Sequence, residues 1–117
     1  MNHRVLAASL AGAMLLSAAA FAQVERNYAM TGVSTDKSTY AGTVEVTKTG
    51  PGFQIVWTIE GTRTFGAGMM EGGSLVVGSV DEGRAIVQVM KPDGRNLKGA
   101  WFRRTESALG EETWIRR

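Results

Sequence analysis

From residue 40 to residue 117 the chain repeats one pattern, a short run of alternating side chains followed by a turn that contains glycine. The predicted turns lie at residues 49–52, 60–62, 71–74, 81–83 and 92–94. Their spacing of roughly 10 to 12 residues is typical of an all-β sandwich or barrel, in which every strand is short. The pattern therefore limits the architecture before any single side chain is considered.

Between the turns, large apolar residues alternate with polar residues, as expected for strands with one face on a core. In residues 53–60 the apolar side is formed by Phe53, Ile55, Trp57 and Ile59, and in residues 40–48 by Tyr40, Val44 and Val46. The same pattern is continued by Phe65 and Met69, Leu75 and Val77, Val87 and Val89, and Leu97 and Trp101. The more continuously apolar run at 85–90 predicts a strand that is partly covered on both faces.

Segments near 27–33 and 112–117 bring the total to about eight strands. An up-and-down meander of eight antiparallel strands has two free edges unless it closes on itself, so we predict a small closed barrel. An open β-sandwich is the alternative. A barrel of eight strands has an interior that is filled by side chains or holds one small ligand. Charged residues such as Glu45, Arg84 and Lys98 on the expected outer face argue against an outer-membrane barrel.

The first 22 residues have the features of a secretory signal peptide. A charged start that includes Arg4 is followed by a mainly apolar stretch of 12 residues at 5–16, which is too short to span a bilayer. Ala20 and Ala22 then form a small-residue cleavage site. We therefore expect export to the periplasm or the medium and a single β-barrel domain at 23–117, with no membrane span after cleavage.

Removal of the signal peptide would also remove His3, the only histidine, and the chain has no cysteine. The mature chain would then lack a Ser-His-Asp or Cys-His nucleophile system, a histidine or cysteine zinc site, and haem ligation through either residue. Its net charge would be +1, which gives no strong attraction for nucleic acid.

The remaining motifs do not indicate catalysis. Gly66-Ala67-Gly68 lies within an alternating segment, so it predicts close packing or a bulge and not a nucleotide-binding loop. The acidic residues are scattered near turns and at the C-terminus, and their spacing selects no pair for glycoside hydrolysis. We predict a protein that is not an enzyme and needs neither a cofactor nor a metal.

The candidate ligand-binding residues are aromatic or basic. A buried tryptophan contributes a large apolar surface and needs a partner for its indole N–H, and tryptophan with arginine is frequent in binding hot spots. Packing within the core is the simpler explanation for the aromatic residues, and a solvated strand end is the simpler one for the basic residues. The candidates are Trp57, Phe65, Trp101, Trp114, Arg103 and Arg116.

The order of the packing and turn residues resembles a group of small exported alphaproteobacterial proteins, mostly uncharacterised, some of which carry a fibronectin-binding label. The residues that carry the resemblance are Tyr40-x-Gly42-x-Val44-x-Val46, Phe53-x-Ile55-x-Trp57, Gly66-x-Gly68, Leu75-x-Val77, Asp93-Gly94-x-x-Leu97-x-Gly99-x-Trp101 and Glu112-x-Trp114. The resemblance implies an exported, adhesive β-domain and transfers no catalytic residue. A looser architectural likeness to lipocalin-like and avidin-like barrels implies a site inside the barrel.

Two classes of function follow. The first is a non-catalytic module of the bacterial envelope that recognises a protein or a surface polymer such as a polysaccharide. The second is a carrier of a small apolar ligand inside the barrel, or a periplasmic enzyme inhibitor. The first is favoured because a short chain with three tryptophans can fill its own interior, whereas an apolar cavity of at least about 300 Å³ would favour a carrier. The sequence leaves the oligomeric state open.

Overall fold

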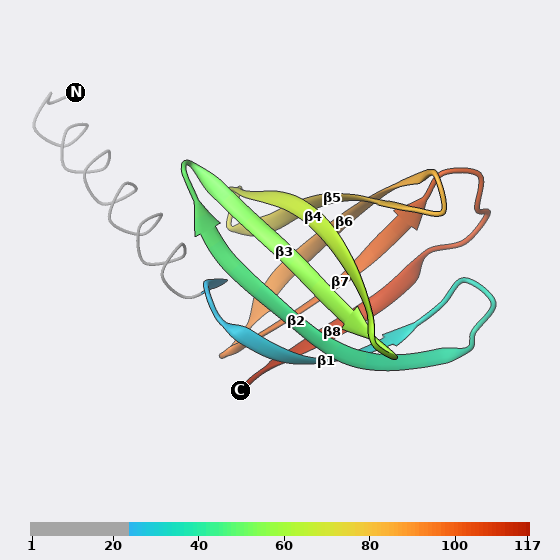
Figure 1. Cartoon of the computed structure of the whole chain (residues 1–117), viewed down its shortest axis with the longest axis horizontal. Helices are drawn as coiled ribbons and strands as arrows, with labels where there is room; N and C mark the ends of the chain where they lie inside the picture. Colours follow the sequence, from blue (N-terminus) through green and yellow to red (C-terminus); the bar gives the residue numbers. More distant parts are fainter. Residues whose placement is uncertain (1–23) are drawn as a thin grey trace, which may run out of the picture.

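The computed structural model describes residues 24–117, so the predicted signal peptide lies outside the described residues. Eight strands follow one another along the chain (Figure 1). They are β1 (Asn27–Val33), β2 (Thr39–Thr49), β3 (Gly52–Ile59), β4 (Thr62–Glu71), β5 (Ser74–Asp81), β6 (Arg84–Asp93), β7 (Asn96–Arg103) and β8 (Gly110–Arg116). Within residues 24–117 no helix is long and apolar enough to cross a membrane.

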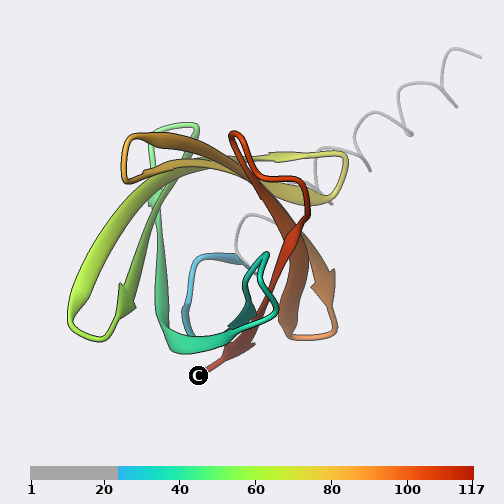
Figure 2. The same cartoon turned by 90° about the vertical axis from the view of Figure 1, so that its right-hand side faces the viewer.

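Each strand pairs antiparallel with the strand before it, and β1 also pairs with β8 to close the barrel. Tyr28 on β1 is thus opposite Val44 of β2 on one side and Arg116 of β8 on the other. The closed ring is visible when the molecule is viewed from the right-hand side of Figure 1 (Figure 2). The predicted up-and-down barrel is therefore confirmed in place of the sandwich.

The two ends of the barrel differ. The end near the C-terminus is packed with apolar side chains, including Val24, Tyr28, Phe53 and Leu97, each at most 3% exposed. The opposite end carries the β1–β2, β3–β4, β5–β6 and β7–β8 connections. The core therefore fills one half of the barrel, and the connections surround the other half.

The prediction of which side chains face inward is correct for β2, β3, β5 and β7 but wrong for β4 and β6. Phe65 and Met69 of β4 are each 57% exposed, and Val87 and Val89 of β6 are also exposed. The inner positions of β6 are instead Ile86, Gln88 and Met90. The outer face of the run at 85–90 is therefore not covered, contrary to expectation.

Packing against β3 explains the orientation of β4. Trp57 faces inward and is directly opposite Thr64, which places Thr64 and Gly66 on the inner face and Phe65 on the outer face. A Cβ on Gly66 would lie only 2.8 Å from the Trp57 ring, so this inner position has no room for a side chain. The close packing predicted for Gly66-Ala67-Gly68 is thus confirmed.

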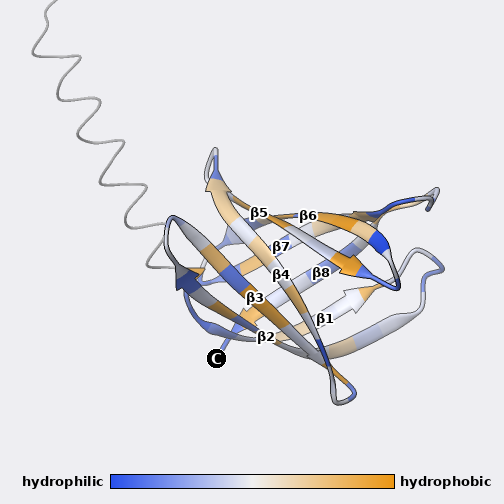
Figure 3. Ribbon diagram, turned by 45° about the horizontal axis from the view of Figure 1, so that its top comes forward, coloured by the Kyte–Doolittle hydropathy of each residue, from blue (hydrophilic) through white to orange (hydrophobic). Residues whose placement is uncertain are grey.

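Hydrophobic and hydrophilic residues follow one another along the strands, whereas the connections are mainly hydrophilic (Figure 3). The exposed apolar side chains on the outer face of β4–β7 are Phe65, Met69, Val80, Val87, Val89 and Phe102. All four strands are joined by direct pairing in this region, because Ala67 is opposite Gly78, Gly78 is opposite Val87, and Val87 is opposite Phe102. We call these six residues the outer apolar face.

Candidate functional site

A cavity of about 250 Å³ opens at the end of the barrel that carries the β1–β2, β3–β4, β5–β6 and β7–β8 connections. Its walls combine aromatic rings with polar and charged side chains. The lining residues are Ser34, Tyr40, Trp57, Ile59, Thr64, Ser79, Asp81, Ile86, Gln88, Trp101, Arg103 and Glu112. Eleven strand positions on seven different strands, together with Ser34 of the β1–β2 connection, therefore contribute to one site whose interior is neither fully packed nor purely apolar.

Glu112 is the acceptor at the inner end of this cavity, where it is only 7% exposed. Its Oε1 atom accepts hydrogen bonds from Trp57 Nε1 at 3.1 Å, Gln88 Nε2 at 3.0 Å and Trp114 Nε1 at 2.9 Å. Its Oε2 atom accepts one from the Tyr40 hydroxyl at 2.6 Å. Four neutral donors thus compensate for the burial of one carboxylate, as a buried charge requires.

All three tryptophans of the chain are connected to this carboxylate. Trp57 and Trp114 donate to it directly, whereas Trp101 Nε1 donates to the Tyr40 hydroxyl at 3.0 Å. Burial and the adjacent Glu112 carboxylate raise the pKa of the Tyr40 hydroxyl far above its ordinary value. Tyr40 therefore stays protonated and keeps donating to Glu112.

Glycines opposite two of these aromatic residues leave room for their rings. Tyr40 is paired with Gly32, and Trp101 is paired with Gly110. A Cβ on Gly32 would lie 2.1 Å from the Tyr40 ring, and a Cβ on Gly110 would lie 2.0 Å from the Trp101 ring. Only glycine at these positions permits the observed ring positions, so the backbone itself fixes the shape of the cavity wall.

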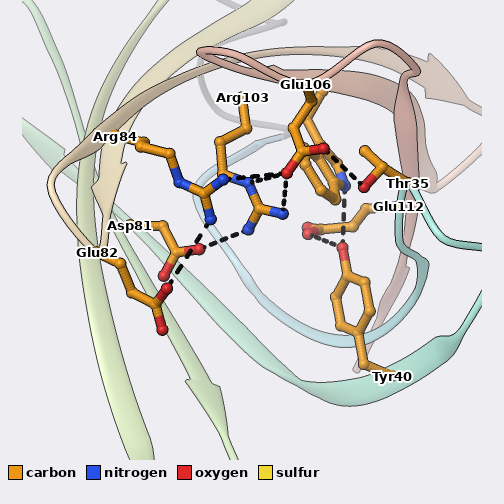
Figure 4. A network of polar contacts seen from close by, with 9 residues as sticks. Thr35, Tyr40, Asp81, Glu82, Arg84, Arg103, Glu106 and Glu112 are labelled. Carbon is orange, nitrogen blue, oxygen red and sulfur yellow. Dashed lines mark hydrogen bonds and ion pairs between the residues drawn. The ribbon is translucent and has the colours of Figure 1, made fainter.

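A second polar network connects the loops around the opening of the cavity (Figure 4). Glu106, in the β7–β8 connection, binds Arg103 Nη2 at 2.7 Å and Arg84 Nη1 at 3.1 Å, and accepts a hydrogen bond from Thr35 of the β1–β2 connection at 3.4 Å. Arg103 Nη1 also binds Asp81 at 2.8 Å. Three connections are therefore held together at this end.

The electrostatics of this second network are consistent with stable ion pairs. The hydrogen bond from Arg103 is the main cause that lowers the pKa of Glu106, and the hydrogen bond to Glu106 is the main cause that raises the pKa of Arg103. The Arg103 guanidinium also lies 5.5 Å from the centre of the Trp101 ring, within cation–π range. Arg103 therefore joins the loop network to the aromatic wall.

The structure brings together three of the six residues predicted as ligand-binding, namely Trp57, Trp101 and Arg103, which all line the cavity. Trp114 is fully buried beneath them and has no exposed surface. Phe65 lies on the outer face of the barrel. Because β7 and β8 are antiparallel, Arg116 lies at the opposite end from Arg103, and the predicted tryptophan–arginine surface is divided.

Sequence reasoning missed the polar centre of the site. In the sequence, Glu112 is one of several scattered acidic residues, and neither Gln88 nor Tyr40 stands out as a site residue. One signal was available for Glu112, since it is two residues from Trp114 and therefore on the same face of the strand. A carboxylate on the inner face of a strand beside a tryptophan predicts a buried hydrogen-bonding centre.

No protein-family model matches this chain, and a search of the curated proteins finds no match either. Within residues 24–117, no group of three or more histidine, cysteine or acidic residues is arranged to hold a metal ion. The geometry of the cavity is thus the main guide to function.

Proposed function

We propose that this chain is a non-catalytic binding protein that takes a small molecule into the cavity at the open end of the barrel. The observation that carries this proposal is the cavity itself. Trp57, Trp101 and Tyr40 form its aromatic walls, and Gln88 and Glu112 provide polar groups at the inner end. Apolar walls with a few convergent polar groups are typical of sites for small ligands.

The volume supports a small occupant. At about 250 Å³ the cavity is slightly below the roughly 300–1,000 Å³ that is common for ligand sites. It suits a molecule of about one ring and is too small for a large lipid or a polymer chain. This proposal corresponds to the carrier alternative from the sequence, but the mixed lining favours a partly polar ligand over a wholly apolar one.

Binding is favoured over catalysis because the charged groups of the cavity are already engaged. Glu112 accepts four hydrogen bonds, and Arg103 is bound to both Asp81 and Glu106. A general acid or base must exchange a proton with a substrate group within hydrogen-bonding reach. Because Glu112 and Arg103 are instead bonded to other protein groups, they serve mainly to orient a ligand.

The proposal is tested by filling the cavity. Ser79 lines the cavity, and its neighbour Val80 is 61% exposed on the outer face. A library of single-ring fragments would be screened by NMR, using the indole N–H signals of Trp57 and Trp101 to detect binding. Fragments that shift both signals should lose their effect in Ser79→Trp and keep it in the control Val80→Trp. The absence of any fragment that shifts these signals in the unmodified protein would refute the proposal.

A second candidate function, recognition of a partner protein, is favoured by the outer apolar face. Val87 and Phe102 lie directly opposite each other there and are 48% and 41% exposed. Exposed apolar patches on small proteins frequently mark interaction sites. A photo-crosslinking residue at Phe102 should form a specific protein adduct in the native cells, and the same residue at Ile115, 44% exposed on β8, should not. Equal labelling at both positions would argue against this function.

The proposed site of action outside the cytoplasm depends on residues 1–22 alone. The supporting features are the charged start, the apolar run and the Ala20-x-Ala22 site. N-terminal sequencing of the protein from its native cells should begin at Gln23. An intact Met1 or Asn2 at the N-terminus would refute export by cleavage.

A further inference from the structure

The inner end of the cavity presents hydrogen-bond acceptors, because the neighbouring donors are already used. Trp57 Nε1, the Tyr40 hydroxyl and Gln88 Nε2 donate to Glu112, and Trp101 Nε1 donates to Tyr40. None of these groups is available to donate to a ligand. A ligand that reaches this end must therefore bring its own donor.

Gln88 contributes the first acceptor. Its side chain is only 3% exposed, and its amide nitrogen is held by Glu112 Oε1 at 3.0 Å and by the Met90 sulfur at 3.3 Å. Because a carboxylate accepts and does not donate, the amide cannot be reversed, and Oε1 of Gln88 is the atom left over. Among residues 24–117 nothing donates to this oxygen, and every side-chain polar atom sealed from solvent has a partner. The Gln88 oxygen must therefore be open to the cavity that the residue lines.

Glu112 contributes the second acceptor together with negative charge. Oε2 of Glu112 accepts only the Tyr40 hydroxyl, which leaves room for one more donor. The cavity lining contains two carboxylates, Asp81 and Glu112, and one guanidinium, that of Arg103. Since Arg103 is bound to Asp81 and also to Glu106, its charge is compensated and that of Glu112 is not.

The surrounding aromatic rings also favour a positively charged ligand. Trp57 and Tyr40 line the cavity next to these acceptors, and the face of an aromatic ring attracts a cation. Hydrogen bonds between a charged donor and a carboxylate are also roughly twice as strong as neutral ones. Charge, hydrogen-bonding capacity and aromatic walls thus point to one chemical class.

We infer that the ligand is a small organic ammonium ion, with its N–H groups directed at Gln88 Oε1 and Glu112 Oε2 and its carbon skeleton against the aromatic walls. This inference rests on the proposed small-molecule function and adds the class of ligand. Ser34, Ser79 and Thr64 line the same cavity, and their hydroxyl groups can donate or accept. The inner end of the cavity, where the acceptors lie, determines the preference.

Three probes of nearly equal size test this inference, namely benzylammonium, benzyl alcohol and benzoate. Their affinities for the full mature protein would be measured at neutral pH by NMR titration of the Trp57 and Trp101 indole signals. Benzylammonium should bind about tenfold to a hundredfold more tightly than benzyl alcohol, as expected for hydrogen bonds to charged groups. Benzoate should bind least, because its carboxylate would face Glu112.

A pair of variants locates the effect. Gln88→Leu removes the acceptor and should weaken benzylammonium binding about tenfold. Gln54→Leu makes the same chemical change at an exposed position of β3 and should leave binding unchanged. An effect of Gln54→Leu as large as that of Gln88→Leu would refute the assignment of the donor position.

The two proposals fail in different ways. If benzyl alcohol or benzoate shifts the Trp57 and Trp101 signals at lower concentration than benzylammonium does, the ligand class is wrong and the small-molecule site stands. If no probe and no fragment of any charge shifts these signals, both proposals are wrong. The comparison of probes uses the unmodified protein, so it does not depend on the folding of Gln88→Leu.

Discussion

Replacing Glu112 tests the hydrogen-bonded centre of the barrel most directly. In Glu112→Leu, four donors lose their acceptor at once, and a buried donor without a partner costs about 1–3 kcal/mol. Trp114 has no exposed surface and cannot reach water, so it incurs the full cost. Tyr40, Trp57 and Gln88 line the cavity and regain part of theirs from water. We expect the free energy of unfolding to fall by about 3–5 kcal/mol.

Glu112→Gln keeps a polar side chain of the same size at this position but changes one of its two acceptor oxygens into a donor group. The amide oxygen can still accept from Trp57, Gln88 and Trp114, and only the bond from Tyr40 loses its acceptor. The expected loss in the free energy of unfolding is about 1–2 kcal/mol.

Urea denaturation followed by tryptophan fluorescence measures these losses, provided that the m-values agree among the variants. Glu111→Leu makes the same change at the exposed neighbouring position and should alter stability by no more than about 0.5 kcal/mol. The reasoning is refuted if Glu112→Leu is destabilised by less than about 1 kcal/mol, or by no more than Glu112→Gln is.

Two further predictions concern Gly110 and Tyr40. Gly110→Ala should displace the Trp101 ring and lower the free energy of unfolding in urea by about 1–3 kcal/mol. The control Gly78→Ala places a Cβ where no atom lies within 4 Å, so it should be neutral or slightly stabilising. Equal losses in the two variants would contradict the proposal that Gly110 leaves space for the Trp101 ring. The pKa of Tyr40 is raised mainly by burial, so its contribution to stability is present below the ordinary value of 10.0 and is lost as the pH rises above it. The urea midpoint of the parent protein should therefore fall as the pH rises above about 10, and it should fall less in Tyr40→Phe. The fall that is left in this variant comes from Tyr28, whose pKa is also raised. An identical pH dependence in parent and variant would contradict the assignment to Tyr40.

The barrel itself was predictable from the sequence because its signals are local. Each predicted turn joins two successive strands that pair, and the alternation around Trp57 correctly gives the inner face of β3. The inner face of β4 was not predictable in this way. Hydrophobicity favours Phe65 as the inward residue, but the Trp57 ring occupies that space and requires Gly66. Only the pairing register between the two strands contains this information.

The site was harder to predict because its parts are far apart in the chain. Tyr40, Gln88 and Glu112 converge from β2, β6 and β8, and no local spacing connects them. The tryptophan indoles do require partners, and the structure provides them through one carboxylate. The predicted arginine surface failed for a related reason, since Arg103 and Arg116 lie at opposite ends of an antiparallel pair, roughly 27 Å apart along the strands.

The pairing of β1 with β8 joins the two ends of the described chain, and this has a consequence for the order of events in folding. Contacts between segments so distant in sequence form late, because closing a long loop costs entropy before the contacts compensate for it. Glu112 lies on β8 opposite Gly32, at this closing seam. The cavity is therefore complete only after the last strand has docked, and transient opening of the seam would release its occupant. A molecule bound against Glu112 would oppose this opening and slow hydrogen exchange at the β1–β8 amides.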